Sequence, residues 1–176
     1  MRRTFLNPGN DGFQTTLRSD IYIDKTGLLR YTNRVIGTDR AFICNSRPRR
    51  FGKSVTANML AAYYSRGCDS EKLFESLDIG RDPSFKEHLN QYNLLRIDVQ
   101  WCCMDAGSAK ETVSYIVEHV LTELREEYPG IVTPEITTVP NALSAIHGAT
   151  GRKCIIVIDE WDFLIRDAAE NEQIQE

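Results

Sequence analysis

The stretch that most limits which folds this chain can adopt is a basic turn that ends in Gly52-Lys53-Ser54. It follows a short apolar run, Ala41 to Cys44, which we expect to be a strand, and it precedes apolar residues with the spacing of one helix face. A strand that stops at a tight turn and restarts as a helix directs the free N–H groups and the positive dipole end of that helix into the turn. Such a turn binds anions, and phosphate groups above all.

Each residue of the turn has a chemical role beside a phosphate chain. Gly52 lets the backbone pass close to a phosphate, Lys53 supplies a catalytic cation for the β- and γ-phosphates, and Ser54 offers a hydroxyl to a magnesium ion. The predicted nucleotide-binding residues are Arg47, Pro48, Arg49, Arg50, Phe51, Gly52, Lys53, Ser54 and Val55. The usual pattern has a glycine where Arg47 stands, so the alternative is a solvated basic turn between a strand and a helix.

A second signal lies near the end of the sequence. The residues from Cys154 to Ile158 are all apolar and mostly β-branched, and Asp159 and Glu160 follow them. A strand that is apolar on every residue is typically buried on both faces of a parallel sheet, and the carboxyl ends of such strands form the ligand crevice. We therefore expect both acids to face the same cleft as Lys53, with Asp159 holding magnesium and Glu160 deprotonating the attacking water. The alternative is that these acids only cap and solvate a strand end.

The remaining pattern alternates strands and helices. A strand is predicted over 94–99, where Asp98 either reaches the cleft or only accepts a hydrogen bond at the strand end. Helices are predicted after the basic turn up to Gly67, over 69–74 with Asp69 as its cap, over 82–89, from a capping box at Ser108 to Tyr128, and from Pro140 to Gly148 or Gly151. This order predicts an α/β fold with a doubly wound, mainly parallel sheet flanked by helices.

We expect one nucleotide-binding domain over 1–176, with a lead-in segment over 1–39 and a phosphate-loop core over 40–176. The lead-in has turn signals over 7–12 and a helical pattern over 28–31. Its apolar residues Tyr22, Ile23 and Leu28 either line an adenine pocket or pack against the edge of the sheet.

Composition excludes several classes of function. With 41% hydrophobic and 26% charged residues, the chain of 176 residues is expected to bury an ordinary globular core. No apolar run has the length of a membrane span and no signal-peptide core follows Met1-Arg2-Arg3, so we expect a cytoplasmic protein with reduced cysteines and no membrane partner. A net charge of −4 argues against a surface that binds nucleic acid as a whole.

Three stretches together resemble the AAA-ATPase-like proteins of bacteria and archaea. They are Tyr22-Ile23-Asp24-Lys25-Thr26, the phosphate loop from Arg47 to Ser54, and Ile158-Asp159-Glu160-Trp161-Asp162. This family tolerates arginine at the position of the first glycine. The resemblance implies a P-loop NTPase fold with ATP and Mg²⁺ as cofactors and with Walker A and Walker B motifs in the last two stretches. It also implies that Lys53 and Ser54 bind triphosphate and magnesium, that Asp159 assists the metal, and that Glu160 is the catalytic carboxylate.

Members of that family are longer, so we expect this chain to be truncated after the Walker B strand. Hydrolysis of ATP is then expected of the full-length protein, along with a nucleic-acid or protein partner bound through the missing part and possible oligomers. Two other functions stay open. One is a nucleotide-dependent switch that binds ATP without significant turnover, and the other is a nucleic-acid contact made by Arg47, Arg49 and Arg50.

Overall fold

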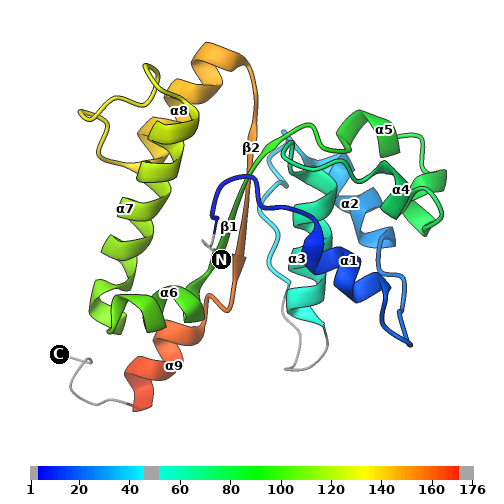
Figure 1. Cartoon of the computed structure of the whole chain (residues 1–176), viewed down its shortest axis with the longest axis horizontal. Helices are drawn as coiled ribbons and strands as arrows, with labels where there is room; N and C mark the ends of the chain where they lie inside the picture. Colours follow the sequence, from blue (N-terminus) through cyan, green and yellow to red (C-terminus); the bar gives the residue numbers. More distant parts are fainter. Residues whose placement is uncertain (1–3, 46–51, 171–176) are drawn as a thin grey trace. The chain divides into compact units, whose positions relative to one another are not determined.

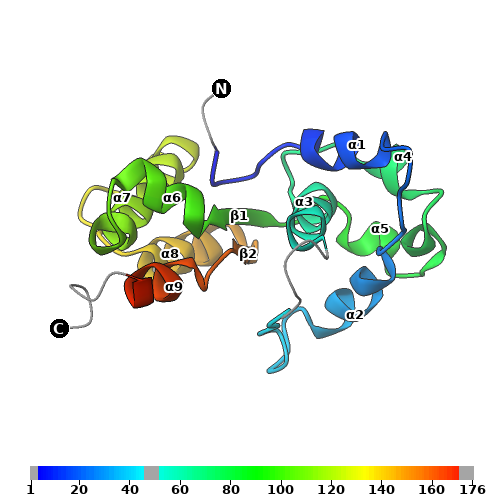
Figure 2. The same cartoon turned by 90° about the horizontal axis from the view of Figure 1, so that it is seen from below.

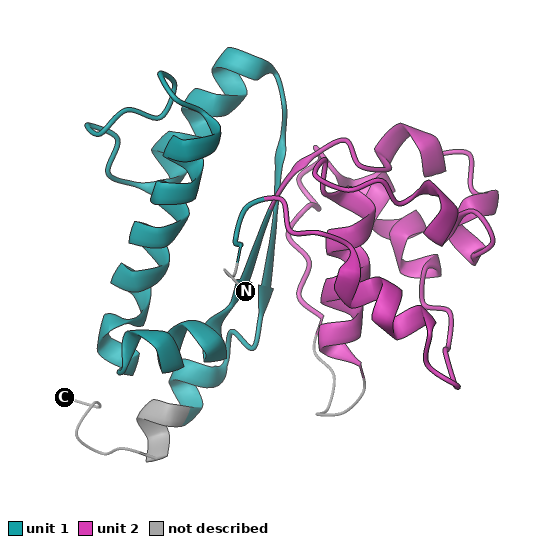
Figure 3. Ribbon diagram, viewed as in Figure 1, with its two compact units in different colours: residues 1–6, 95–176 teal, residues 7–94 magenta. Residues whose placement is uncertain are grey.

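The computed structural model describes residues 4–45 and 52–170, with side chains up to Arg166 (Figure 1). Five of the predicted phosphate-loop residues, Arg47, Pro48, Arg49, Arg50 and Phe51, therefore lie outside the described residues. The chain divides into two compact units, residues 7–94 and residues 1–6 with 95–176, which Figure 3 colours separately. Each unit is considered by itself below.

The unit over 7–94 is helical in its described part. Its elements are α1 (Asp11–Leu17), α2 (Gly27–Val35), α3 (Lys53–Tyr64), α4 (Glu71–Phe74), the 3₁₀ helix η1 (Asp78–Arg81) and α5 (Phe85–His88). The predicted helix after the basic turn is confirmed as α3, and α1 packs against it (Figure 2). Most of α3 is buried, so the position of its first turn is set by the core of this unit.

Aromatic side chains from α3 hold that core together. The Tyr63 ring meets the Phe74 ring edge-on at 5.3 Å between centroids, and Phe74 stacks on Phe13 of α1 at 4.8 Å. The buried Tyr63 hydroxyl donates to the Phe85 carbonyl oxygen at 2.9 Å and accepts from the Asn33 amide at 3.0 Å. Because the buried Tyr63 hydroxyl is hydrogen-bonded, the large aromatic area of this side chain is removed from water at little polar cost.

The other unit contains a sheet and the longer helices. Its elements are β1 (Asn93–Asp98, which starts two residues before the unit boundary), α6 (Val99–Ala106), α7 (Ala109–Glu127), α8 (Val139–Thr150), β2 (Cys154–Asp159) and α9 (Phe163–Glu170). β1 and β2 pair as a two-stranded parallel sheet. The core cluster joins Leu95 of β1 to α7 and α8, whose packing Figure 1 shows. This mixture of helices with a small parallel sheet is compatible with the predicted α/β class.

Several predicted elements are confirmed with the expected end signals. Ser108 is the N-cap of α7, and its hydroxyl accepts from the Glu111 amide at 3.3 Å. Gly151 ends α8 with a φ of 68°, a left-handed conformation that favours glycine. The strands predicted over 94–99 and 154–158 are β1 and β2. Within the described ranges, no helix is both long and apolar enough to cross a membrane.

The strand predicted from Ala41 to Cys44 is wrong. Residues 41–45 form no strand, and the Phe42 side chain is 96% exposed. A strand is stable only when a neighbouring strand takes up its backbone hydrogen bonds, and nothing in the described part of the chain pairs with this segment. Burial of β2 on both faces was also a wrong prediction, because Ile156 and Ile158 are 48% and 52% exposed on one face of the two-stranded sheet.

Three smaller predictions also need correction. The turn predicted over 7–12 continues into α1, and α6 follows β1 where no helix was expected. α4 is capped at Ser70 and not at Asp69. The helix predicted over 82–89 is reduced to the single turn of α5, because Asp82 accepts from the amide and hydroxyl of Ser84 and so forms a local turn before it.

Candidate functional site

A pocket lies at the start of α3, within the unit over 7–94. Its volume is about 640 Å³, within the range of small-molecule sites. The lining includes Asp24, Lys25, Leu28, Lys53, Thr56 and Asp78. The pocket thus brings together the Asp24-Lys25-Thr26 segment and the first turn of α3, although the two are far apart in the sequence.

Gly52 is required at this place for two reasons. Its φ of 76° lies in the left-handed region that disfavours side chains, and a Cβ added there would lie 2.8 Å from Lys25 Nζ. The Gly52 carbonyl oxygen accepts hydrogen bonds from the backbone amide and from the hydroxyl of Thr56, each at 3.0 Å. Helix α3 therefore starts directly at this turn. The amides of the first helical turn have no partner within the helix itself, which gives the pocket an electropositive end.

Asp24 fixes the segment that faces this turn. One carboxylate oxygen accepts from the Thr26 amide at 2.8 Å and from the Thr26 hydroxyl at 2.7 Å, and the other accepts from the Asp78 amide at 2.8 Å. Burial alone raises the pKa of Asp24, but the hydrogen bonds from Thr26 and Asp78 and the charge of Arg30 outweigh it and hold the pKa below its usual value. Thr26 is fully buried and accepts from the Ile79 amide at 3.2 Å.

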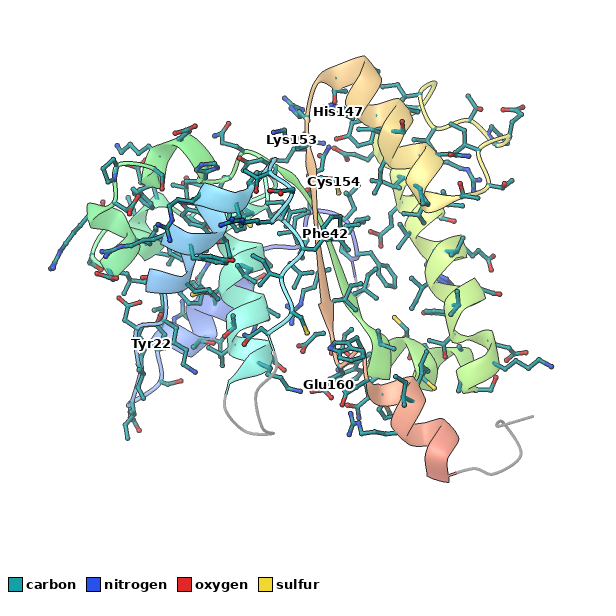
Figure 4. All side chains as sticks on the ribbon, turned by 180° about the vertical axis from the view of Figure 1, so that it is seen from behind. Tyr22, Phe42, His147, Lys153, Cys154 and Glu160 are labelled. Carbon is teal, nitrogen blue, oxygen red and sulfur yellow. The ribbon has the colours of Figure 1, made fainter. Side chains whose placement is uncertain are left out.

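The acidic motif lies in the other unit, at the end of β2, where Figure 4 labels Glu160. Asp159 is 6% exposed; its Oδ1 accepts from the Glu160 amide at 3.1 Å, and its Oδ2 has no hydrogen-bond partner among the described residues. Glu160 has a φ of 51°, and its carboxylate pairs with Arg166 at 3.0 Å. Arg166 also pairs with Asp162 at 3.1 Å, so α9 supplies one positive charge to this acidic strand end.

Asp98, at the end of β1, lies within electrostatic range of the same acids. Its carboxylate accepts from the Trp101 amide at 3.0 Å and so caps α6, which agrees with the hydrogen-bond acceptor expected at this strand end. Burial raises the pKa of Asp98, and the negative charges of Asp159 and Glu160 raise it further. The negative charges at the end of β2 therefore act on the carboxylate at the end of β1.

Among the described residues no group of three or more acidic, histidine or cysteine side chains is placed to hold a metal ion, but one buried carboxylate oxygen has the chemistry that magnesium prefers. Mg²⁺ prefers hard oxygen ligands, and a buried carboxylate oxygen without a hydrogen-bond donor, such as Asp159 Oδ2, is costly unless a cation or water satisfies it. Ser54, the other predicted ligand, is exposed in the first turn of α3.

We compared the sequence with models of known protein families. A family model described as "Predicted AAA-ATPase" matches residues 9–176. The chain belongs to the AAA-ATPase-like family. No curated protein and no solved structure matches it. The family's name is consistent with nucleotide binding, and the match runs through both the pocket at α3 and the acidic end of β2.

For this AAA-ATPase-like chain, sequence reasoning identified Lys53 and Leu28, both of which line the pocket. Tyr22 instead packs edge-on against Phe13 at 6.1 Å, and burial raises its pKa to about 12, while Ile23 is 69% exposed. Lys25 lies in the stretch Tyr22-Ile23-Asp24-Lys25-Thr26 that resembles the family, but no role was predicted for it from the sequence alone. The signal for it was its place between Asp24 and Thr26, two residue types that form local hydrogen-bonded turns.

Proposed function

We propose that this AAA-ATPase-like chain binds Mg²⁺–ATP at the start of α3, and that the full-length protein hydrolyses it. The observation that carries the proposal is the pocket of about 640 Å³ in which Lys53, the first turn of α3 and the Asp24-Lys25-Thr26 segment meet. In this proposal residues 47–55 are the Walker A motif of a doubly wound P-loop domain. The family match over residues 9–176 supports this assignment.

The roles of the residues follow from their chemistry. Lys53 binds the β- and γ-phosphates, and the first-turn amides of α3 donate hydrogen bonds to oxygens of the phosphate chain. Ser54 and Asp159 are the residues that would hold magnesium, and a bound ion would supply positive charge beside the phosphate oxygens. Glu160 orients a water molecule and takes its proton at a carboxylate oxygen.

Titration with a fluorescent ATP analogue in magnesium tests the binding step. We expect Lys53→Ala to weaken binding about tenfold or more, since one hydrogen bond to a charged group contributes about 1.5–3 kcal/mol. Lys72→Ala is the matched control, because Lys72 is exposed on α4 and does not line the pocket. Equal affinity of Lys53→Ala and wild type would remove Lys53 from the phosphate site.

A nucleotide-dependent switch without significant turnover is the second candidate. The observation that favours it is the ion pair between Glu160 and Arg166, because the paired carboxylate oxygen is engaged by the guanidinium and reaches a water molecule only when the pair opens. Glu160→Gln in the full-length protein separates the two functions. An ATPase is expected to lose about 10²–10⁴-fold in turnover while keeping its affinity for ATP, whereas a switch shows no change in either quantity.

A further inference from the structure

We propose that Lys25 is a second phosphate-binding cation of this site and contacts the phosphate chain of the bound nucleotide directly. The inference rests on the proposed function, since it concerns the same pocket. It starts from the contact between Lys25 Nζ and Gly52, which is so close that a Cβ on Gly52 would lie 2.8 Å from the nitrogen. The ammonium group therefore lies at the turn that opens α3, and Lys53 is the next residue along.

Charge is concentrated where these two lysines meet. Lys25 and Lys53 both line the pocket, and the N-terminus of α3 adds its own partial positive charge. Like charges in one pocket repel, and an anion that carries several charges relieves this repulsion. An ammonium has three donors and no acceptor, so phosphate oxygens suit it well.

The acids in the same pocket are engaged with other groups. Both oxygens of Asp24 accept hydrogen bonds, from Thr26 and from the Asp78 amide. Asp78 Oδ1 pairs with Arg30 at 2.7 Å. These acids therefore shape the turn and the start of η1.

The turn that carries Lys25 is fixed on both sides. Asp24 binds η1 through the Asp78 amide, and the fully buried Thr26 binds it through the Ile79 amide. With both neighbours held against η1, the backbone of Lys25 has little freedom. Its side chain is thus directed to Gly52 by the fold of this unit, as expected for a preorganised ligand contact.

Competition of ATP and AMP against a fluorescent ATP analogue tests the inference. We expect Lys25→Met to weaken the binding of ATP about tenfold or more but the binding of AMP by less than about threefold, because AMP lacks the outer phosphates. Lys25→Arg keeps the charge and should stay within about threefold of wild type for ATP. Lys72→Met, on the exposed face of α4, is the control and should change neither affinity.

A second measurement needs no substitution. In wild-type protein, saturating Mg²⁺–ATP should slow acetylation of the Lys25 amine several-fold, as read by mass spectrometry, and leave Lys72 unchanged. Lack of protection at Lys25 would overturn the inference even if Lys25→Met failed to fold.

The outcomes separate the two proposals. If wild type does not bind ATP, the proposed function fails and the role of Lys25 fails with it. If wild type binds and Lys53→Ala weakens binding, but Lys25→Met is unchanged or weakens ATP and AMP by the same factor, the proposed function stands. In that case only the phosphate contact of Lys25 is wrong, and its role is to hold the turn.

Discussion

Asp24 joins the Asp24-Lys25-Thr26 segment to the start of η1, because its carboxylate accepts two hydrogen bonds from Thr26 and one from the Asp78 amide. Its pKa in the folded protein is held below the usual value by hydrogen bonds that outweigh its burial, so ionised Asp24 stabilises the fold. This contribution is complete above the unfolded pKa, near 3.9, and is lost as the pH falls through the lower folded pKa.

We expect Asp24→Ala to lower the free energy of unfolding by about 2 kcal/mol at pH 7, because the Asp78 amide and the Thr26 hydroxyl lose their acceptor. The difference from wild type should shrink below about pH 4. Urea unfolding followed by circular dichroism measures it. Asp20→Ala, at an exposed site, should have little effect, and an equal loss in both variants would contradict the role given to Asp24.

At this scale the sequence predicted residue chemistry better than residue contacts. Gly52, Lys53 and Asp159 were chosen for their places in two short motifs, and their roles in binding remain predictions. The approach of Lys25 to Gly52 was not predictable, since it depends on a hydrogen bond from the Asp78 amide to Asp24 across the fold of the unit.

Among the elements, α8 shows how strongly position determines the effect of a glycine. Gly148 lies exposed in the helix with open space around it, whereas Gly151 ends the helix with a φ of 68°. We expect Gly148→Ala to raise the free energy of unfolding by about 0.5–1 kcal/mol and Gly151→Ala to lower it by about 1–2 kcal/mol.

Thermal or urea unfolding of the two α8 variants measures this difference in sign. The pair is its own control, because both substitutions add one methyl group with no heavy atom within 4 Å other than those of the neighbouring residues and the local helix backbone. Effects of the same sign would mean that the backbone at Gly151 relaxes out of its left-handed conformation.

Elements with strong local signals were predictable. α7 has a cap at Ser108 and a long apolar stripe, and α8 has proline near its start and glycine at its end. α6 was missed because its apolar residues point all round the helix, with Trp101 and Met104 exposed, so no helical period marks it. The strand from Ala41 to Cys44 failed because pairing, and not composition, decides whether an apolar run becomes a strand.

For the molecule as a whole, ligand binding should appear as added stability. If Mg²⁺–ATP binds only the folded chain, ATP at about 100 times its Kd raises the free energy of unfolding by about 2.7 kcal/mol. We expect a matching rise in Tm in a thermal shift assay. Removing magnesium with EDTA should reduce the rise, and Lys53→Ala should abolish most of it. A rise that persists unchanged in Lys53→Ala would place ATP elsewhere.

The sequence alone determined the α/β character, the long helices, the two strands of the sheet and the family, because these depend on local periodicity and on short motifs. Tertiary structure decided which residues meet at the start of α3, which face of β2 stays exposed, and that residues 41–45 are not a strand. These features depend on contacts between segments far apart in the chain, and such contacts are set by packing and backbone pairing, which no local pattern specifies.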